Sequence, residues 1–276
     1  MTRINCPVCF RRCPLEEGET GFCRARRNTG GRSVSVSYGK ITSAALDPVE
    51  KKPFVKFHPG SLILSVGTFG CNMDCPFCQN YEIAGAGEGG VPTRSISPTE
   101  LAALADELRG RGNIGVAYTY NEPLIGWEFV RNSAAEVKKR GLKNAAVTNG
   151  SVSAETLSEL LPYIDAYNID LKGFTDEYYR KLGGNLESVK EFIKTAASKA
   201  HVELTTLIVP GENDGDDEMA ALSAWIASVD RKIPLHLTRF FPRRLMSNRK
   251  PTETALLRRL AEIAAKRLDT VVMGNI

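Results

Sequence analysis

From residue 62 onward, short β-rich apolar runs alternate with longer amphipathic stretches, and this alternation constrains the fold more than any other feature. No hairpin turn signal separates successive apolar runs, so helical crossovers must connect them, as in βαβ units of a parallel sheet. The expected strands are Leu62–Val66, Ile114–Thr119, Asn144–Thr148, Ala166–Leu171, Val202–Val209, Pro234–Phe240 and Thr270–Met273. The expected helices are Thr99–Gly112, Trp127–Arg140, Ala154–Leu161, Leu186–Ala200, Asp217–Val229 and Glu253–Arg267.

Nearly every expected strand has an apolar interior and ends in polar or reactive residues. In (β/α) barrels the active site is built from the loops that follow the carboxyl ends of the strands. The pattern therefore favours an α/β fold with a partial (β/α)6 TIM-like barrel over a doubly wound open sheet, which shows the same alternation. We expect a barrel over residues 61–276, preceded by a small cysteine-rich metal-binding region over residues 1–60.

The composition is that of an ordinary globular protein, with 276 residues, 42% of them apolar and 25% charged. No run approaches ~20 uninterrupted apolar residues, so no membrane span is expected. The N-terminus lacks an apolar signal core, which predicts a cytoplasmic protein. In a reducing compartment, the seven cysteines are expected to bind metal rather than form disulfides.

Cys71, Cys75 and Cys78 follow the first expected strand in the pattern C-x3-C-x2-C. Three thiolates on one short loop can bind three irons of a [4Fe–4S] cluster, which leaves the fourth iron open to a chelating small molecule. Phe77 places an aromatic side chain beside the cluster, where a purine can pack. The alternative is a zinc site or a set of buried thiols, but a structural zinc usually has four protein ligands and nothing nearby supplies the fourth.

A second set of cysteines precedes the barrel. Cys6, Cys9, Cys13 and Cys23 have the spacing C-x2-C-x3-C-x9-C, which predicts a second bound metal. Zinc and an auxiliary iron–sulfur cluster both suit this spacing. We favour zinc slightly, because a small region without a hydrophobic core needs a structural metal to stabilise it.

The C-x3-C-x2-C motif with Phe77 resembles the signature of radical S-adenosylmethionine (SAM) enzymes. Three further motifs resemble the family of pyruvate formate-lyase activating enzymes: Thr148-Asn149-Gly150, Asp170-Leu171-Lys172 and Val209-Pro210-Gly211. Almost the whole chain is similar to the radical SAM enzymes of the AmmeMemoRadiSam system. The segments that carry this likeness include the N-terminal cysteines, residues 45–53, Cys78-Gln79-Asn80, residues 118–123 and Arg239-Phe240-Phe241-Pro242.

This resemblance implies a barrel of the radical SAM type, a [4Fe–4S] cluster that binds SAM, and a flavodoxin or ferredoxin as electron donor. The cluster would cleave SAM to methionine and a 5′-deoxyadenosyl radical, which abstracts hydrogen from a substrate. For activating enzymes that substrate is a glycine of a glycyl-radical enzyme, but a different protein, a nucleic acid or a small molecule remains an alternative. No catalytic side chain beyond the cluster ligands is assigned.

Residues at the expected strand ends are candidates for SAM binding. The segment Tyr120-Asn121-Glu122-Pro123 occupies the place of the family's Gly-Gly-Glu-Pro-like turn, so Glu122 is expected to face the SAM ammonium. Because side chains alternate along a strand, Asp170 and Lys172 share one face, where they can bind the ribose and the SAM carboxylate or form only an interior ion pair. The other candidates are Thr148, Asn149, Val209 and His236.

Clusters of basic residues leave a different class of function open. One lies between Arg239 and Lys250, and the other between Arg11 and Arg32. Solvated surface explains both more simply, but a non-catalytic metal-binding module that docks nucleic acid is an alternative. An electron-transfer protein with two clusters is a third hypothesis, although it does not explain why the C-x3-C-x2-C motif lacks a fourth ligand.

Overall fold

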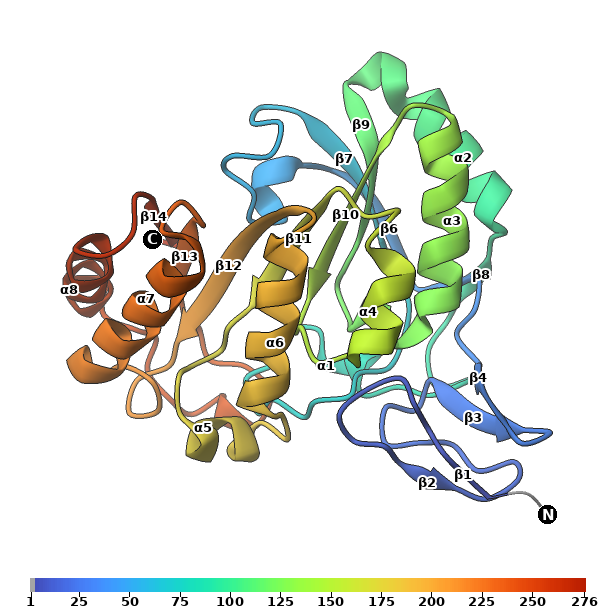
Figure 1. Ribbon diagram of the computed structural model, residues 1–276, viewed down its shortest axis with the longest axis horizontal. Coiled ribbons are helices and arrows are strands. Elements are labelled where there is room, and N and C mark those ends of the chain that lie inside the picture. Colours follow the sequence, from blue (N-terminus) through green and yellow to red (C-terminus); the bar gives the residue numbers. More distant parts are fainter. Residues whose placement is uncertain (1–2) are drawn as a thin grey trace.

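The computed structural model describes residues 3–276, and its centre is an eight-stranded sheet (Figure 1). The strand order is β14-β13-β12-β11-β10-β9-β7-β6, and all neighbours are parallel except the antiparallel pair of β6 and β7. Among the described strands, β6 and β14 form the two edges of this sheet and do not pair with each other. The fold is therefore a partial barrel, as the sequence predicts.

The expected strands are all present, each within one residue of its predicted ends. The strands of the sheet are β6 (Ser43–Pro48), β7 (Leu62–Gly67), β9 (Asn113–Tyr118), β10 (Lys143–Thr148), β11 (Ala166–Asp170), β12 (His201–Ile208), β13 (Leu235–Arg239) and β14 (Val271–Gly274). The sequence did not predict β6, which joins part of the expected N-terminal region to the barrel sheet. Its alanine-rich sequence ends in Pro48, which suits an exposed edge better than the interior of a sheet.

Helices cover the outer face of the sheet (Figure 1). They are α2 (Pro98–Glu107), α3 (Trp127–Lys139), α4 (Ala154–Leu160), α5 (Asp176–Lys181), α6 (Leu186–Ala197), α7 (Asp216–Asp230) and α8 (Thr254–Ala265), with the short α1 (Tyr81–Ala84) after the cysteine loop. The start of α2 is confirmed as a capping box between Ser97 and Glu100, and Gly141 ends the α3 segment at a φ of 69°. The short α5 was not predicted.

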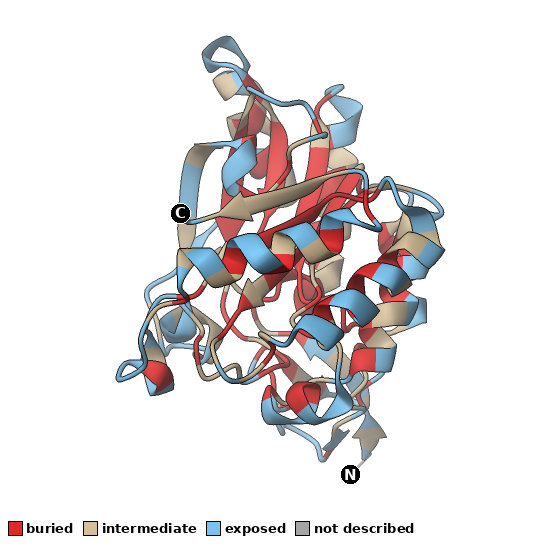
Figure 2. Cartoon of the chain, turned by 90° about the vertical axis from the view of Figure 1, so that its left-hand side faces the viewer, coloured by how far each residue is buried: buried red, intermediate tan, exposed pale blue. Residues whose placement is uncertain are grey.

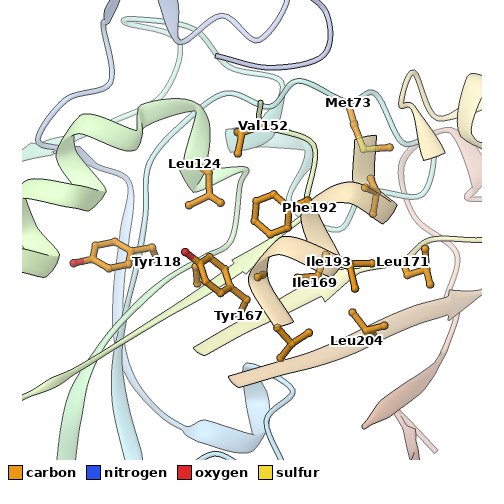
Figure 3. Packing of buried hydrophobic residues seen from close by; sticks show 14 of the residues in the cluster. Met73, Tyr118, Leu124, Val152, Tyr167, Ile169, Leu171, Phe192, Ile193 and Leu204 are labelled. Carbon is orange, nitrogen blue, oxygen red and sulfur yellow. The ribbon is translucent and has the colours of Figure 1, made fainter. Parts of the chain in front are cut away.

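The core lies between the sheet and these helices, where buried residues line the strands and the inner helix faces (Figure 2). Figure 3 shows Phe192 and Ile193 of α6 over Tyr167 and Ile169 of β11. Met73, from the cysteine loop, belongs to the same core. The loop is therefore packed onto the barrel and does not extend freely into solvent. No helix among residues 3–276 is long and apolar enough to cross a membrane.

A loop after β6 closes the inner face of the sheet near the amino ends of the strands. Phe54 and Phe57 pack there against a row of small residues on three neighbouring strands, Ala117, Ala145 and Ala166. Alanines at these paired positions leave room for the two phenyl rings. The loop therefore fills this end of the barrel, and a cavity remains on the other side.

Glu203 of β12 anchors this loop. Its side chain is fully buried and accepts hydrogen bonds from the main-chain N–H groups of Val55 and Lys56 at 2.8–3.0 Å. The Nε2 atoms of His201 and His236 form hydrogen bonds with the same carboxylate, at 2.8 and 2.7 Å respectively. Burial opposes ionisation, but these hydrogen bonds outweigh it and lower the pKa of Glu203 to about 2.

The N-terminal region folds into two small antiparallel pairs, β1 (Ile4–Asn5) with β2 (Pro14–Leu15) and β3 (Arg26–Thr29) with β4 (Arg32–Ser35). A further pair, β5 (Lys40–Ile41) with β8 (Arg94–Ser95), lies beside them. The first two pairs lie beyond the end of the barrel that carries α1 (Figure 1). Main-chain hydrogen bonds join this region to the turn after β10, from Phe10 N to Ser151 O and from Ser153 N to Val8 O.

We expect Glu203→Gln to destabilise the protein by about 3 kcal/mol, because the amide cannot accept from all the donors around the buried carboxylate. The carboxylate contribution is present above the ordinary glutamate pKa and is lost as the pH falls towards about 2, because the folded-state pKa is lowered. Thermal unfolding of the two proteins at several pH values measures the difference. Glu191→Gln, on the exposed surface of α6, is the control and should change the free energy of unfolding by at most about 0.5 kcal/mol. Equal melting of Glu203→Gln and the wild type would contradict this role.

Candidate active site

A cavity of about 440 Å³ lies at the carboxyl ends of the strands, and we call it the barrel cavity. Its lining includes all three cysteines of the C-x3-C-x2-C motif. Eight of the ten residues expected to bind SAM also line it: Phe77, Tyr120, Asn121, Glu122, Thr148, Asn149, Asp170 and Lys172. The chain thus brings most of the predicted site residues to one place.

The cysteine loop is held on both sides by arginines that bind its main-chain carbonyls. Arg11 donates to Asn72 O at 2.7 Å and to Gly183 O at 2.5 Å. Arg244 donates to Cys75 O at 2.8 Å and pairs with Asp74 at 2.6 Å. These contacts fix the backbone that carries the three thiols.

Asn121 holds the beginning of the same loop. Its Oδ1 accepts from Thr68 N at 3.0 Å, and its Nδ2 donates to Gly70 O at 2.9 Å. Asn80, after the last cysteine, donates to the main-chain oxygen of Tyr120 at 2.7 Å. The turn after β9 and the cysteine loop therefore form one hydrogen-bonded unit.

The three thiols lie in an environment that favours their neutral form when no metal is bound. Burial raises the pKa of Cys75 to about 11 and also raises the pKa values of Cys71 and Cys78. The charge of Lys172 acts in the opposite direction on all three. Because thiolates are the ligands of iron, cluster binding must release protons here, and Lys172 offsets part of the negative charge that results.

Glu122 is fully buried beside the cysteines and accepts three hydrogen bonds. Its donors are Leu124 N at 3.0 Å, the Thr148 hydroxyl at 2.8 Å and Asn149 N at 2.7 Å. Burial nevertheless raises the pKa of Glu122 to about 7. Two carboxylate oxygens offer about four acceptor positions, so one position remains for a donor on a ligand in the cavity.

Asn149 links this carboxylate to the cysteines. Its Nδ2 donates to Asn72 Oδ1 at 2.9 Å and lies 3.8 Å from Cys71 Sγ. Asn72 in turn donates to Ser151 Oγ at 2.9 Å, and the main-chain oxygen of Ser151 accepts from Phe10 N, next to Cys9. Hydrogen bonds therefore connect the N-terminal region that carries Cys9 with the C-x3-C-x2-C loop.

Asp170 and Lys172 form a direct ion pair at the end of β11, with 2.8 Å between Oδ2 and Nζ. Burial opposes the charged form of Lys172, but the charge of Asp170 outweighs it and raises the lysine pKa. The ion pair expected from the sequence is confirmed, and both residues line the barrel cavity, so binding of the ribose and the SAM carboxylate stays a prediction. The second Asp170 oxygen is free to accept from a hydroxyl.

Three expected positions differ from the prediction. Val209 and His236 do not line the barrel cavity, because Val209 is packed in the core and His236 binds Glu203. His236 is the second residue of β13 and therefore lies towards the opposite end of the strand. Tyr120 lines the cavity, but its hydroxyl donates to Asp47 of β6 at 3.0 Å and so points away from the cysteine loop.

The four N-terminal cysteines lie together beside the cysteine loop. Cys6, Cys9 and Cys23 are buried, and Cys13 is half-buried. Burial raises the pKa values of Cys9 and Cys23, and the thiols are close enough for Cys6 and Cys13 to add to the shift of Cys9. Within residues 3–276, no three Cys, His, Asp or Glu side chains stand at the spacing of ligands to a single ion.

Sequence reasoning missed the residues that position the site. Arg11 and Arg244 were grouped with surface charge, yet they clamp the cysteine loop. Asn72 was not singled out from the sequence, because no local pattern distinguishes it. Lys51 and Lys52 also line the cavity, and the likeness of residues 45–53 to a known family was the only signal that could have found them.

The donor set fits the group that the motif implies. Three cysteines on one clamped loop face a single cavity that has room for a small ligand. Beside them lie a carboxylate with a spare acceptor position and a lysine–aspartate pair. Cys71, Cys75 and Cys78 could hold a [4Fe–4S] cluster that keeps one iron open towards this cavity.

Comparison with known proteins gives relatives over the same region. Residues 65–223, more than half of the chain, match the family model of the radical SAM superfamily. "Uncharacterized protein MJ0808" of Methanocaldococcus jannaschii is 35% identical over 99% of this chain and 82% of its own length. Pyruvate formate-lyase 1-activating enzyme of Escherichia coli (strain K12) is 31% identical over 54% of this chain and 61% of its own length.

A solved structure agrees with the fold. SuiB from Streptococcus suis superimposes with a TM-score of 0.60 at 14% identity, over 76% of this chain and 48% of its own. At this identity the likeness concerns the fold alone. The family model, by contrast, spans the cysteine loop and strands β9 to β12, which carry most of the cavity residues. The chain therefore belongs to the radical SAM superfamily, whose members bind a [4Fe–4S] cluster and SAM.

Proposed function

We propose that this protein cleaves SAM reductively and uses the resulting radical to abstract hydrogen from a substrate. The observation that carries the proposal is the convergence of Cys71, Cys75 and Cys78 with Glu122 and the Asp170–Lys172 pair in one cavity. When bound there, a [4Fe–4S] cluster supplies one electron to SAM, which yields methionine and a 5′-deoxyadenosyl radical.

Each side chain of the site binds a different group of SAM. The spare acceptor position of Glu122 takes the ammonium, and Lys172 takes the carboxylate. Asp170 accepts from a ribose hydroxyl, and Phe77 packs against the adenine ring. The walls of the cavity exclude water and other hydrogen donors, which is the protein's main contribution to controlling a radical.

The proposal also concerns the substrate and the electron donor. Likeness to activating enzymes supports a glycyl-radical protein as substrate, with flavodoxin or ferredoxin as electron donor in the cytoplasm. Likeness of the whole chain to the AmmeMemoRadiSam group supports a distinct substrate, which is a different protein or a small molecule. Those two readings share the same first step and differ only in what donates the hydrogen.

The N-terminal cysteines are proposed to hold a second metal, either zinc or an auxiliary iron–sulfur cluster. Support comes from the grouping of four thiols, three of them buried, on a region with little core of its own. Main-chain hydrogen bonds of Val8 and Phe10 with the turn after β10 tie this region to the active site.

The alternative of a nucleic-acid docking module finds little support in the arginine clusters. Arg26 is buried and pairs with Glu128, and Arg11 and Arg244 bind the cysteine loop. Arg249 pairs with Glu212, and Arg27 pairs with Glu88. These five guanidinium groups are already engaged in contacts within the chain, which removes them from the surface available to phosphates.

We expect the anaerobically reconstituted protein, reduced with dithionite, to form 5′-deoxyadenosine and methionine from SAM. Cys78→Ala should lower the rate of 5′-deoxyadenosine formation at least about 1,000-fold, because the loss of one of the three ligands removes the cluster that supplies the electron. Chromatography of the nucleoside products and iron analysis of both proteins measure this. Ser158→Ala, on the exposed face of α4, is the control. A wild type that carries the cluster but forms no 5′-deoxyadenosine would refute the proposed function.

The raised pKa of Glu122 predicts a pH dependence of SAM binding. The carboxylate must be ionised to bind the ammonium, so affinity should rise with pH up to about 7 and level off above it. Below that value the affinity should fall about tenfold per pH unit. Equilibrium binding of SAM to the reconstituted protein measures the profile.

The variant Glu122→Gln tests the same assignment. It should bind SAM at least about tenfold more weakly at pH 8 and should show no inflection near pH 7. Glu107→Gln, at the exposed end of α2, should keep both the affinity and the inflection. A profile for Glu122→Gln that matches the wild type would assign the ammonium to another residue.

For the second metal, Cys9→Ala should lose either zinc or about four irons with their sulfide, because one of four ligands is removed. Elemental and sulfide analysis of matched wild-type and variant preparations distinguishes the two metals. A Cys9→Ala variant with the full wild-type content of zinc and iron would overturn the second site.

A further inference from the structure

Part of the barrel cavity lies beyond the residues proposed to bind SAM. This part is lined by Lys51 and Lys52, by Tyr120, and by Thr205, Leu207 and Thr238 of β12 and β13. The lysines belong to the segment that follows β6, at and just after the short helix η1 (Val49–Lys51). Nothing in the proposed SAM site uses these side chains, so the cavity has a second, unassigned half.

The centre of this half is a buried charged group. Lys52 Nζ lies 2.9 Å from Asp47 Oδ2 and 3.5 Å from the Tyr120 hydroxyl, and only 5% of the lysine side chain is exposed. The ammonium also lies 4.6 Å from the centre of the Tyr120 ring. Lys51 approaches the other oxygen of Asp47 at 3.6 Å. We call Asp47, Lys51, Lys52 and Tyr120 the Lys52 cluster.

Two features of the cluster work against stability. A buried ion pair usually contributes no more than well-packed apolar residues of similar volume would. Tyr120 adopts a φ of 74°, a left-handed conformation that is unfavourable for a non-glycine residue. Gly67 makes room for it, because a Cβ at Gly67 would lie 2.9 Å from Tyr120 Cδ2. Such costs are typical of ligand-binding positions, and both occur on the wall of one cavity.

The charges of the cluster define what it can bind. Burial opposes ionisation of Asp47, but its hydrogen bond with Lys52 and the lysine charge outweigh burial and lower its pKa. Burial lowers the pKa of Lys52, against the opposing effect of its hydrogen bond with Asp47. With both lysines protonated, one carboxylate faces two ammonium groups, which leaves one excess positive charge. The Asp170–Lys172 pair elsewhere in the cavity is neutral as a whole.

The hydrogen-bonding capacity of the Lys52 cluster also favours an anionic ligand. An ammonium has three donors, and Asp47 and Tyr120 accept from only two of those on Lys52. Thr205 and Thr238, on β12 and β13, line the same cavity, and the Thr205 hydroxyl donates to Asn168 Oδ1 at 2.9 Å. A group with one negative charge and several acceptor atoms matches this arrangement, as a carboxylate does. A phosphate dianion would exceed the available charge.

We propose that the Lys52 cluster is a subsite for the carboxylate of a small-molecule substrate, held in the same cavity as SAM. The proposal rests on the function proposed above and gives the substrate a chemical class. Lys52 supplies the main charge and Lys51 adds to it from the rim. Asp47 and Tyr120 position Lys52, and the strained backbone of Tyr120 keeps the ring beside the ammonium.

The test uses N-acetylglycine as the carboxylate probe and N-acetylglycinamide as its uncharged analogue. Titration calorimetry measures the binding of each to the full chain, reconstituted and loaded with SAM. We expect the carboxylate to bind and the amide to bind at least about tenfold more weakly, since a charge-assisted hydrogen bond is lost. Inorganic phosphate should bind no more tightly than N-acetylglycine.

Variants test whether the probe binds at the Lys52 cluster. Lys52→Met should weaken binding of N-acetylglycine about tenfold, and Lys51→Met about threefold because that lysine is more exposed. Lys56→Met, an exposed lysine on the same loop, is the matched control and should bind the probe as the wild type does. If Lys52→Met does not fold, the double variant Asp47→Asn/Lys52→Met removes both charges together, and Lys51→Met provides an independent reading.

Three results would overturn the subsite. They are equal affinity for N-acetylglycine and its amide, unchanged affinity in Lys52→Met and Lys51→Met, or no binding of the carboxylate to the SAM-loaded wild type. Calorimetry requires no turnover, whereas the proposed function is judged by the formation of 5′-deoxyadenosine. A failure of the subsite therefore leaves the radical reaction standing, and a failure of the reaction leaves the binding result readable.

Discussion

The buried carboxylate of Glu203 determines which end of the partial barrel is closed. An open sheet of parallel strands has an inner face that must be covered, and helices cover only the outer one. Here a loop fills the inner face near the amino ends, with two phenylalanines over a row of alanines. The loop has no regular hydrogen bonds of its own at this point, so Glu203 accepts from its main-chain N–H groups. The barrel cavity is what remains on the other side.

The cavity in turn depends on a rigid cysteine loop. Main-chain carbonyls of the loop accept hydrogen bonds from arginines in distant parts of the chain. Asn121 binds the beginning of the loop. These contacts mean that the thiols are positioned before any metal binds, and that the cost of ordering them is met during folding. Glu122 follows β9 and the Asp170–Lys172 pair lies at the end of β11, and both strands pair with β10, so the sheet also fixes these residues relative to the cysteines.

Most of the barrel could be predicted from the sequence because hydrophobic periodicity reports directly on burial. The strands and long helices fell within a few residues of their predicted positions, and the cysteines, Glu122, Asp170 and Lys172 converge as expected. Strand β6 escaped prediction because a short, exposed, alanine-rich edge has no strong period. His236 was misplaced because polar character was taken as a mark of the strand end, whereas it lies near the start of β13 and binds a buried glutamate from the neighbouring strand. The roles of Arg11, Arg244 and Asn72 depend on contacts between residues far apart in the sequence, which no local pattern records.

The two arginine clamps also bear on how the protein is assembled. Arg11 contacts Gly183, which is 172 positions further along the chain, and Arg244 contacts Cys75 across 169 positions. During synthesis the cysteine loop emerges early, yet it acquires its second clamp only after nearly the whole chain has been made. Before that point Arg11 and Asn121 can hold the beginning of the loop, but Cys75 O and Asp74 still lack the arginine that binds them. The backbone around Cys75 is therefore completed only when synthesis of the chain is almost finished.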